Sequence, residues 1–175
     1  MVVTPAMEYS YKGTTLKIKR IPYYLLSLLA LLKAMKPFTQ INFLLQVISR
    51  RDIYILLKND LGFRVKTLLD VLTLKEVVLD GEYEKFGVTV ERGDKVIVDV
   101  GAGFGDFSIL QAKRHPHAAI YAFEPDPKYF ALLQENIRAN LVHNIISSPL
   151  AVTSLVQIFK TIQSNPIQSN IFSSM

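Results

Sequence analysis

The chain has 175 residues, of which 50% are apolar and 20% charged, with no cysteine and a net charge of +5. This composition is typical of a globular protein rather than a disordered chain, and the length allows about one domain with its own core. The absence of cysteine excludes disulfides, thiolate nucleophiles and cysteine-ligated metals, and it suits a reducing compartment, so we expect a cytoplasmic protein.

The positive charge is concentrated in the N-terminal part of the chain. Residues 1–66 hold 11 Lys or Arg and 3 Asp or Glu, a balance of +8, whereas residues 67–175 hold 9 and 12, a balance of −3. Such a basic segment can meet nucleic acid, an anionic membrane or an acidic substrate, and a solvated helix face explains it equally well. We divide the chain into a basic helical segment over 1–66 and a domain over 67–175.

Two helices are predicted in the basic segment, after an irregular tail over 1–15. They cover 21–35 and 40–58, and Pro37 separates them because proline disfavours helical backbone at the residue before it. The apolar run Ile21–Leu32 is shorter than the ~20 apolar residues that a membrane-spanning helix needs, so no membrane span is expected. A buried or docking helix, contact with a membrane interface, and a processed signal are the alternatives for this run.

The rest of the chain is predicted to alternate strands and helices. Short apolar runs over 63–90 indicate strands joined by a turn. Further strands are expected at 95–100, 118–123, 145–152 and 156–162, with helices at 107–114 and 127–141. The resulting βαβαβ order predicts an α/β fold with a parallel, Rossmann-like sheet and right-handed crossovers, preceded by the helical N-terminal segment.

A glycine loop follows the strand expected at 95–100. The end of the strand and the loop read Asp99-Val100-Gly101-Ala102-Gly103-Phe104-Gly105-Asp106, and a helix is expected directly after them. Glycines let the backbone turn sharply and approach a ligand closely, and the helix N-terminus offers N–H groups to a carboxylate or phosphate. A dinucleotide fingerprint would need its third glycine at Asp106, and no P-loop Gly-Lys-Ser/Thr follows. A tight turn without a ligand is the alternative.

A second acidic residue stands at the end of the next strand. Glu124 comes 25 residues after Asp99 and is followed by Pro125 and Asp126. A carboxylate at the tip of this strand can accept hydrogen bonds from both ribose hydroxyls of a nucleoside. Asp126 also fits the N-cap of the helix that begins at Pro127, and this capping role explains it without a ligand.

The pattern D-x-G-x-G-x-G resembles motif I of the class I methyltransferases that use S-adenosylmethionine (SAM). The stretches Gly93–Ala102, Phe107-Ser108, Tyr121–Pro127 and Glu135–Asn140 resemble the FkbM family, and the resemblance covers about residues 75–160. It implies SAM as the cofactor and O-methyl transfer to a hydroxyl of a small-molecule or glycan acceptor. The cofactor-binding residues that it implies are Asp99, Gly101, Ala102, Gly103, Gly105, Glu124, Pro125 and Asp126. Phe104 departs from the Asn or Ile more usual in the family.

The sheet that the sequence predicts is incomplete. The resemblance implies seven strands, whereas at most four are expected after residue 94. An apolar sheet edge would then need covering by a partner, by the N-terminal helices or by a C-terminal half absent from this chain. Two further interpretations are an RNA methyltransferase, with residues 12–66 as its basic surface, and a non-catalytic SAM-binding fragment.

No catalytic residue is assigned from the sequence. A hydroxyl acceptor would benefit from a general base, and His115, His117 and His143 are the natural candidates. All three precede predicted strands, so we expect them at the end of the sheet away from the glycine loop. No metal site is predicted, because no second cluster of carboxylates accompanies the loop.

Overall fold

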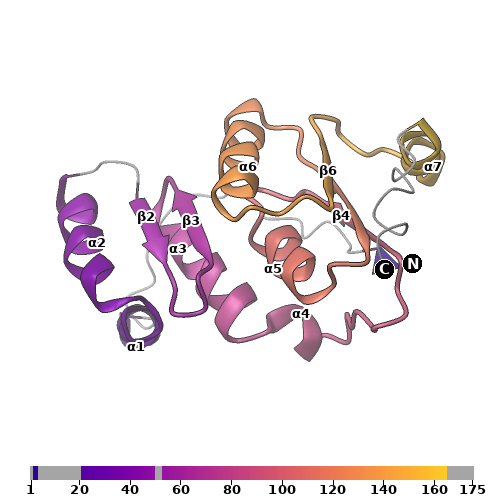
Figure 1. Cartoon of the computed structure of the whole chain (residues 1–175). Helices are drawn as coiled ribbons and strands as arrows, with labels where there is room; N and C mark the ends of the chain where they lie inside the picture. Colours follow the sequence, from indigo (N-terminus) through magenta and orange to yellow (C-terminus); the bar gives the residue numbers. More distant parts are fainter. Residues whose placement is uncertain (1, 4–20, 50–52, 165–175) are drawn as a thin grey trace.

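The computed structural model describes residues 2–3, 21–49 and 53–164. These residues form a four-stranded sheet, a separate two-stranded hairpin and helices packed around them (Figure 1). The strands are β1 (Val2–Val3), β2 (Ile53–Leu56), β3 (Gly62–Val65), β4 (Val96–Val100), β5 (Ala119–Phe123) and β6 (Ile145–Ser148). The helices are α1 (Ile21–Ala34), α2 (Pro37–Ser49), α3 (Leu68–Leu74), the π-helix η2 (Lys75–Leu79), α4 (Glu82–Lys85), α5 (Asp106–Arg114), α6 (Pro127–Ala139) and α7 (Leu155–Ser164).

The main sheet has the order β1-β4-β5-β6, and every neighbouring pair is parallel. Val98 of β4 pairs with Tyr121 of β5, which in turn pairs with Ile146 of β6. Every residue of β5 is buried, as in a parallel strand covered on both faces. Helices α5 and α6 connect β4, β5 and β6, so the predicted Rossmann-like α/β fold is confirmed.

The two faces of the sheet have separate cores, because successive side chains of a strand point to opposite faces. Ile97 and Ile120 belong to the larger core, which includes residues of α5 and α6. Tyr121 and Phe123 face the other way and pack with Ile158 of α7. The strand predicted over 156–162 is therefore wrong, because the apolar side chains there recur at the helical spacing of three and four residues.

The N-terminal segment contains a hairpin as well as the two predicted helices. The break at Pro37 is confirmed, since α1 ends at Ala34 and α2 begins at Pro37. The helix predicted to reach residue 58 is wrong beyond α2, because residues 53–56 form β2, antiparallel to β3. Ile53, Ile55 and Leu57 are buried in alternation, which is the period of a strand.

Helices replace the strands that were predicted over most of 63–90. Only β3 lies in this range, and α3, η2 and α4 follow it. A capping box starts α3: the Asp70 N–H donates to Thr67 Oγ1 at 3.1 Å, and the Thr67 N–H donates to Asp70 Oδ2 at 2.9 Å. This reciprocal pair satisfies two N–H groups at the helix start, so the apolar residues after it continue as a helix.

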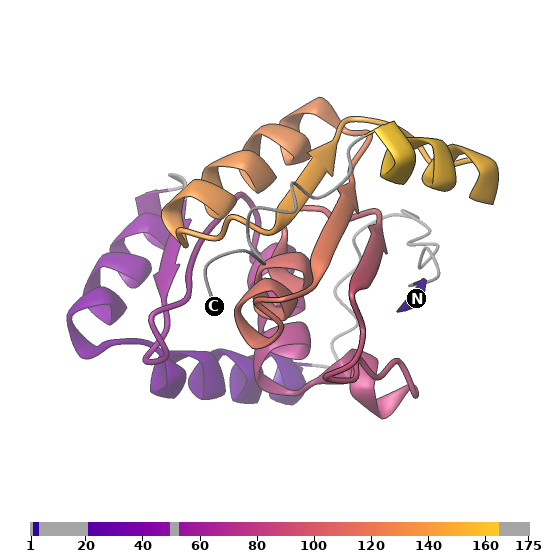
Figure 2. The ribbon, with the colours of Figure 1, turned by 45° about the vertical axis from the view of Figure 1, so that its right-hand side comes forward.

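The N-terminal and C-terminal elements of the described chain lie at opposite ends of the molecule. Both ribbon views place α1, α2 and the β2–β3 hairpin at one end and α7 at the other, with β4, β5 and β6 between them (Figures 1 and 2). The tail predicted over 1–15 is contradicted at Val2–Val3, which form β1, and otherwise lies outside the described residues. No helix within the described ranges has the length and apolar character to cross a membrane.

Candidate ligand site at the glycine loop

The glycine loop joins the carboxyl end of β4 to the first residue of α5. Gly101, Gly103 and Gly105 have φ angles of 79°, 54° and 91°, which side chains other than glycine rarely adopt. The N–H groups of Gly101 and Ala102 both donate to the carbonyl oxygen of Phe123, at 2.8 and 2.9 Å. The loop is thus held against the carboxyl end of β5, where ligands bind in open α/β sheets.

The three glycines serve different purposes. A Cβ atom on Gly101 or Gly103 would meet no described atom within 4 Å, so both border open space. A Cβ atom on Gly105 would lie 2.5 Å from Leu133 Cδ1 of α6, so this glycine permits the close packing of loop and helix. The side of the loop available to a ligand is therefore that of Gly101 and Gly103.

Glu124 connects the loop with the turn after β5. Its Oε2 accepts a hydrogen bond from the Gly103 N–H at 2.7 Å, and its Oε1 accepts one from the Asp126 N–H at 2.8 Å. The residue is only 7% exposed. Each carboxylate oxygen has a second lone pair, so Glu124 keeps capacity for hydroxyl donors of a ligand.

Two buried carboxyl groups lie behind the loop. Burial raises the pKa of Asp99 to about 6, although the Ser108 hydroxyl donates to Asp99 Oδ2 at 2.6 Å and so opposes the rise. Burial also raises the pKa of Asp106 to about 7, against the hydrogen bond of 2.9 Å that Asp106 Oδ1 accepts from the Phe107 N–H. Among the described residues, no group donates a hydrogen bond to Asp106 Oδ2. Negative charge is therefore costly here unless a cationic group compensates it.

The predicted N-cap of α6 is confirmed. Asp126 Oδ1 accepts hydrogen bonds from the N–H groups of Lys128 and Tyr129 at 2.7 and 3.2 Å, and Pro127 occupies the first turn. Pro125 and Asp126 are exposed, beside the buried Glu124. Of the eight residues implied as cofactor ligands, Asp99 lies in β4, and the other seven lie in the loop and in the turn after β5, which the hydrogen bonds of Glu124 and Phe123 hold together.

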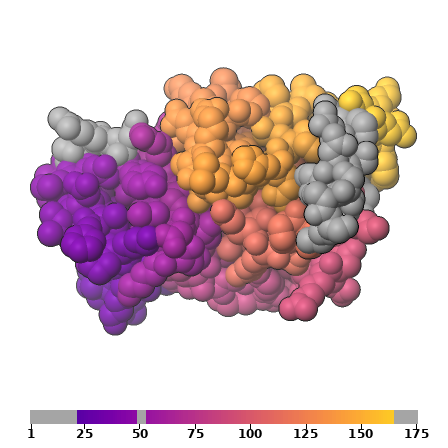
Figure 3. All heavy atoms as spheres, in the orientation of Figure 1, coloured from indigo at the N-terminus to yellow at the C-terminus, as the bar shows by residue number. Residues whose placement is uncertain are grey.

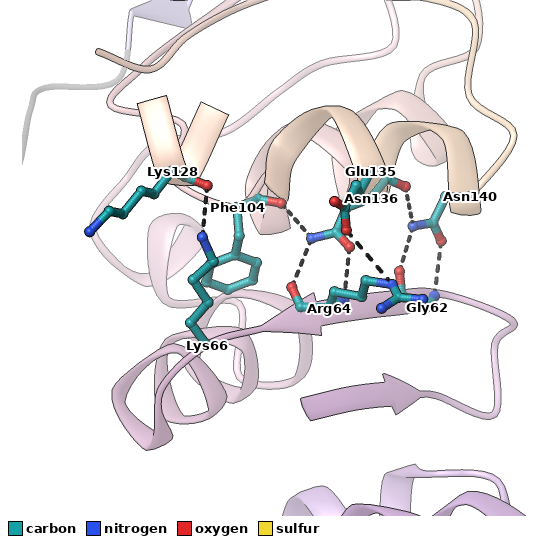
Figure 4. Close-up of polar contacts among 8 residues, drawn as sticks. All are labelled: Gly62, Arg64, Lys66, Phe104, Lys128, Glu135, Asn136 and Asn140. Atoms are coloured by element: carbon teal, nitrogen blue, oxygen red, sulfur yellow. Dashed lines mark hydrogen bonds and ion pairs between the residues drawn. The ribbon is translucent and has the colours of Figure 1, made fainter. Parts of the chain in front are cut away.

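Two asparagines, Asn136 of α6 and Asn140 at the C-cap of α6, form hydrogen bonds with the hairpin, and sequence reasoning missed these contacts (Figure 4). Asn136 Oδ1 accepts from the Arg64 N–H at 2.7 Å, and Asn136 Nδ2 donates to the Arg64 carbonyl oxygen at 3.0 Å. Asn140 Oδ1 accepts a hydrogen bond from the Gly62 N–H at 2.9 Å, and Asn140 Nδ2 donates to the Gly62 carbonyl oxygen at 2.6 Å. The two amides pair with alternate residues of β3, much as a neighbouring strand would.

Asn136 also reaches the glycine loop. Its Nδ2 donates to the carbonyl oxygen of Phe104 at 2.9 Å, so one amide bonds both to β3 and to the loop (Figure 4). A second link joins Tyr129 of α6 to Asp70 of α3 through a hydroxyl–carboxylate bond of 3.0 Å. The signal for the asparagine pair was its spacing of four residues, which places both on one helix face, but the sequence does not name their partners.

The histidines lie where the sequence predicted. His115 caps the C-terminus of α5 and, with His117, precedes β5, whereas His143 precedes β6. The glycine loop and Glu124 follow the opposite, carboxyl ends of β4 and β5. Across the described ranges, no three His, Cys, Asp or Glu side chains are placed to hold a metal ion together.

Comparison with known proteins relates the site region to methyltransferases. A family model described as the TRM5/TYW2 methyltransferase domain matches residues 62–165, more than half of the chain. The 31-O-demethyl-FK506 methyltransferase FkbM of Streptomyces tacrolimicus is 40% identical over 62 residues, which are 35% of this chain and 24% of that protein. The tRNA(Phe) (4-demethylwyosine(37)-C(7)) aminocarboxypropyltransferase of Methanocaldococcus jannaschii is 37% identical over 57 residues, which are 33% of this chain and 23% of that protein.

Among solved structures, TYW2 of M. jannaschii in complex with AdoMet is similar with a TM-score of 0.42 and 25% identity. The similarity covers 57% of this chain and 43% of that one. The matches with the two curated relatives span about a quarter of the length of each relative.

Proposed function

The chain belongs to the family of TRM5/TYW2 methyltransferase domains, and we propose that it binds SAM at the glycine loop and takes part in methyl transfer. Membership of a methyltransferase family agrees with the expectation drawn from the glycine loop. The narrower assignment to the FkbM family has the support of the 62-residue match and stays a proposal.

The observation that carries the proposal is the junction between Glu124 and the glycine loop. The carboxylate accepts hydrogen bonds from Gly103 and Asp126 while Gly101 and Gly103 border open space. One ligand at this place could therefore contact the Glu124 carboxylate, the backbone of Gly101 and Gly103, and the N-terminus of α5. This donor and acceptor set fits a nucleoside that also carries an amino acid.

The residues present fit SAM in charge as well. SAM supplies, when bound, a methyl group on a positively charged sulfonium. Asp99 and Asp106 are buried near the two ends of the loop, and no group among the described residues donates to Asp106 Oδ2. A cationic ligand near these carboxyls would lower the cost of their ionisation.

We assign the cofactor contacts to the two joined segments. Glu124 would accept hydrogen bonds from the ribose hydroxyls, and Pro125 and Asp126 would lie along the adenine. Asp99, Gly101, Ala102, Gly103 and Gly105 would shape the loop beside the methionine part. Positioning of the reactants supplies much of the rate of a direct transfer, and no residue is assigned as a general base.

The acceptor that we propose first is a hydroxyl of a small molecule or glycan. Its support is the 40% identity to a methyltransferase that acts on 31-O-demethyl-FK506. The match covers only 24% of that protein, so the acceptor has to be tested directly with SAM and candidate hydroxyl compounds.

RNA is the second candidate acceptor. Family membership and the 37% identity to a tRNA-modifying enzyme favour it, and residues 1–66 carry a balance of +8. A titration with tRNA at low and high salt separates the two candidates. An RNA enzyme should bind tRNA with an affinity that falls steeply with salt, because binding releases cations from the phosphates and added salt reduces the free energy gained by that release.

Calorimetric titration with SAM tests the shared premise. We expect Glu124→Ala to weaken SAM binding by about 10- to 100-fold, because charge-assisted hydrogen bonds contribute about 1.5–3 kcal/mol. Glu135→Ala is the matched control, since it removes an exposed carboxylate of α6 that pairs with Arg64 at 3.8 Å. A folded wild-type protein that does not bind SAM, or a Glu124→Ala variant that binds like wild type, would contradict the proposed site.

A further inference from the structure

Asp106 carries a buried carboxyl oxygen without a hydrogen-bond partner. The residue is the first of α5, directly after Gly105, and it is only 7% exposed. The space-filling view shows the atoms of α5 (salmon) against those of α6 (orange), the helix whose Leu133 approaches Gly105 (Figure 3). Asp106 Oδ1 accepts a hydrogen bond from the Phe107 N–H at 2.9 Å, but no group among the described residues donates to Oδ2. Buried polar atoms almost always have a partner, so this oxygen points to a group that the chain alone does not supply.

The start of α5 does not account for this oxygen. Gly105 is the N-cap and has no side chain, and the one N–H group that Asp106 meets in the next residue is satisfied by Oδ1. Asp70, at the start of α3, shows the contrast. Its Oδ2 accepts hydrogen bonds from two backbone N–H groups, and its Oδ1 accepts one from the Tyr129 hydroxyl. Asp70 therefore has donors on both oxygens, whereas Asp106 has a donor on only one.

The charged groups that act on Asp106 are acidic as well. Burial, and then the negative charges of Asp99 of β4 and Asp70 of α3, raise the pKa of Asp106 to about 7, against the hydrogen bond from the Phe107 N–H. Glu124 acts on Asp99 in the same direction. No described Lys or Arg forms an ion pair with Asp106. A cation that reaches Oδ2 would therefore favour the ionised form of Asp106, which the protein alone disfavours.

We propose that Asp106 pairs through Oδ2 with a cationic centre of the methionine part of SAM and releases its proton to the solvent when that centre binds. The proposal rests on the proposed function, which puts the methionine part beside the glycine loop that leads into Asp106. SAM has two such centres, a sulfonium and an ammonium group, and either one would offset the burial of the carboxylate. No bond of the ligand changes: the carboxyl O–H bond breaks, and the proton goes to the buffer. A metal ion is a poorer occupant, because across the described ranges no three His, Cys, Asp or Glu side chains are placed to hold one.

Calorimetric titration of the full chain with SAM counts this proton. At about pH 6.5, the heats in phosphate and in imidazole buffer should differ by the release of about half a proton to one proton per SAM, because a carboxyl with a pKa of about 7 is mostly protonated there. The ammonium group of SAM keeps its proton at this pH and adds nothing to the count. The measurement needs no variant. SAM binding without proton release would overturn the proposal and leave the SAM site itself in place.

The affinity for SAM should depend on pH for the same reason. Since the cation favours the ionised carboxylate, the affinity should be about tenfold higher at about pH 7 than at about pH 5.5. Asp106→Asn keeps an acceptor for the Phe107 N–H but cannot ionise, so it should abolish the proton release and most of this pH dependence. Asp99, whose pKa is raised to about 6, remains in the variant and accounts for the rest.

Glu135→Gln is the matched control, because it makes the same change from carboxyl to amide at an exposed position of α6. It should keep the proton release and the pH dependence of wild type. An Asp106→Asn variant that releases as much proton as wild type would overturn the proposal, since another group would then be the source.

Two analogues of SAM identify the cationic centre. S-adenosylhomocysteine keeps the ammonium group but has a neutral sulfur, and methylthioadenosine has neither charge. Proton release with SAM and S-adenosylhomocysteine assigns the ammonium group as the partner, and release with SAM alone assigns the sulfonium. Release on binding of methylthioadenosine would overturn the proposal, because no cation is present to stabilise the carboxylate. A folded chain that binds no SAM in either buffer would overturn the proposed function as well, so the two failures can be told apart.

Discussion

Asn136 donates from its side-chain amide to the carbonyl oxygen of Phe104, at 2.9 Å, and thereby bonds α6 to the middle of the glycine loop. The same amide group exchanges two hydrogen bonds with the backbone of Arg64 in β3. Asn136 is fully buried, so none of these bonds has water as a ready substitute. The position of the loop therefore depends on a hairpin that contains no predicted ligand of the cofactor.

Asn136→Ala should lower the free energy of unfolding by about 2–4 kcal/mol, because it removes the partner of the buried Phe104 carbonyl oxygen and of the part-buried backbone groups of Arg64. Asn140→Ala should lower the free energy of unfolding by a similar amount, because Gly62 loses its two hydrogen bonds to this side chain. The bond between Asn136 and Phe104 remains in this variant. Urea unfolding measures both losses. Under conditions where both variants are folded, calorimetry should show weaker SAM binding for Asn136→Ala than for Asn140→Ala, and equal affinities would exclude the link through Phe104.

Alanine at Gly101 and at Gly105 should act differently. Both glycines have positive φ, so each substitution costs about 1–2 kcal/mol in backbone strain. Only at Gly105 would the new Cβ also clash with Leu133, so Gly105→Ala should be the more destabilising in thermal unfolding. Gly101→Ala should instead weaken SAM binding in the folded protein, because its Cβ enters the open side of the loop. A Gly101→Ala variant with wild-type affinity would place the ligand elsewhere.

The raised pKa of Asp106 predicts a fold that loses stability as the pH rises. The folded state holds this proton up to about pH 7, whereas the unfolded state releases it near the ordinary value of 3.8. The free energy of unfolding should therefore fall between about pH 4 and 7, and Asp99 should add to the fall up to about pH 6.

Asp106→Asn is the variant that tests this titration. Asparagine stays neutral and keeps the acceptor for the Phe107 N–H, so the variant should exceed wild type by at least about 1 kcal/mol near pH 8 and match it near pH 4. Urea unfolding at the two pH values measures the difference. A wild-type protein that is the more stable one near pH 8 would mean that a cation pairs with Asp106.

Substitutions at Asp126 can separate its capping role from a role at the adenine. Asp126→Ala should cost about 1 kcal/mol of stability, because the N–H groups of Lys128 and Tyr129 lose their acceptor. Asp126→Asn keeps an acceptor oxygen and should restore most of the stability in thermal unfolding. If Asp126→Asn also binds SAM like wild type, capping alone explains the residue, and a loss of affinity at full stability would favour an adenine contact.

The sequence predicted those parts of the fold whose determinants are local. The strand before Gly101, the glycine loop and the helix capped by Asp126 are each specified within a few neighbouring residues, and the structure has all three. The region around Ile158 was misassigned as a strand because its apolar residues suit a strand in composition, whereas their spacing makes one helix face that packs on Tyr121.

The hydrogen bonds between the hairpin and the two asparagines could not be predicted, for a different reason. Gly62 and Asn140 are 78 residues apart, and only the folded chain brings them together. Asn140 could have been interpreted as an ordinary polar residue at a helix end, since nothing near it in the sequence indicates a strand to bind. The sequence predicts the eight cofactor-binding residues as one set, but it does not predict the hydrogen bond that the Phe104 carbonyl oxygen accepts from Asn136.

The long sequence distance between the hairpin and the two asparagines also has a consequence for the chain during its synthesis. Gly62 and Arg64 are translated 78 and 72 residues before Asn140 and Asn136. Until α6 has been made, one edge of β3 lacks the acceptors and donors that later pair with it, and an unpaired strand edge invites association with other chains. The nascent protein would therefore have a period of aggregation risk that ends when α6 docks, and docking of α6 also fixes Phe104 in the glycine loop.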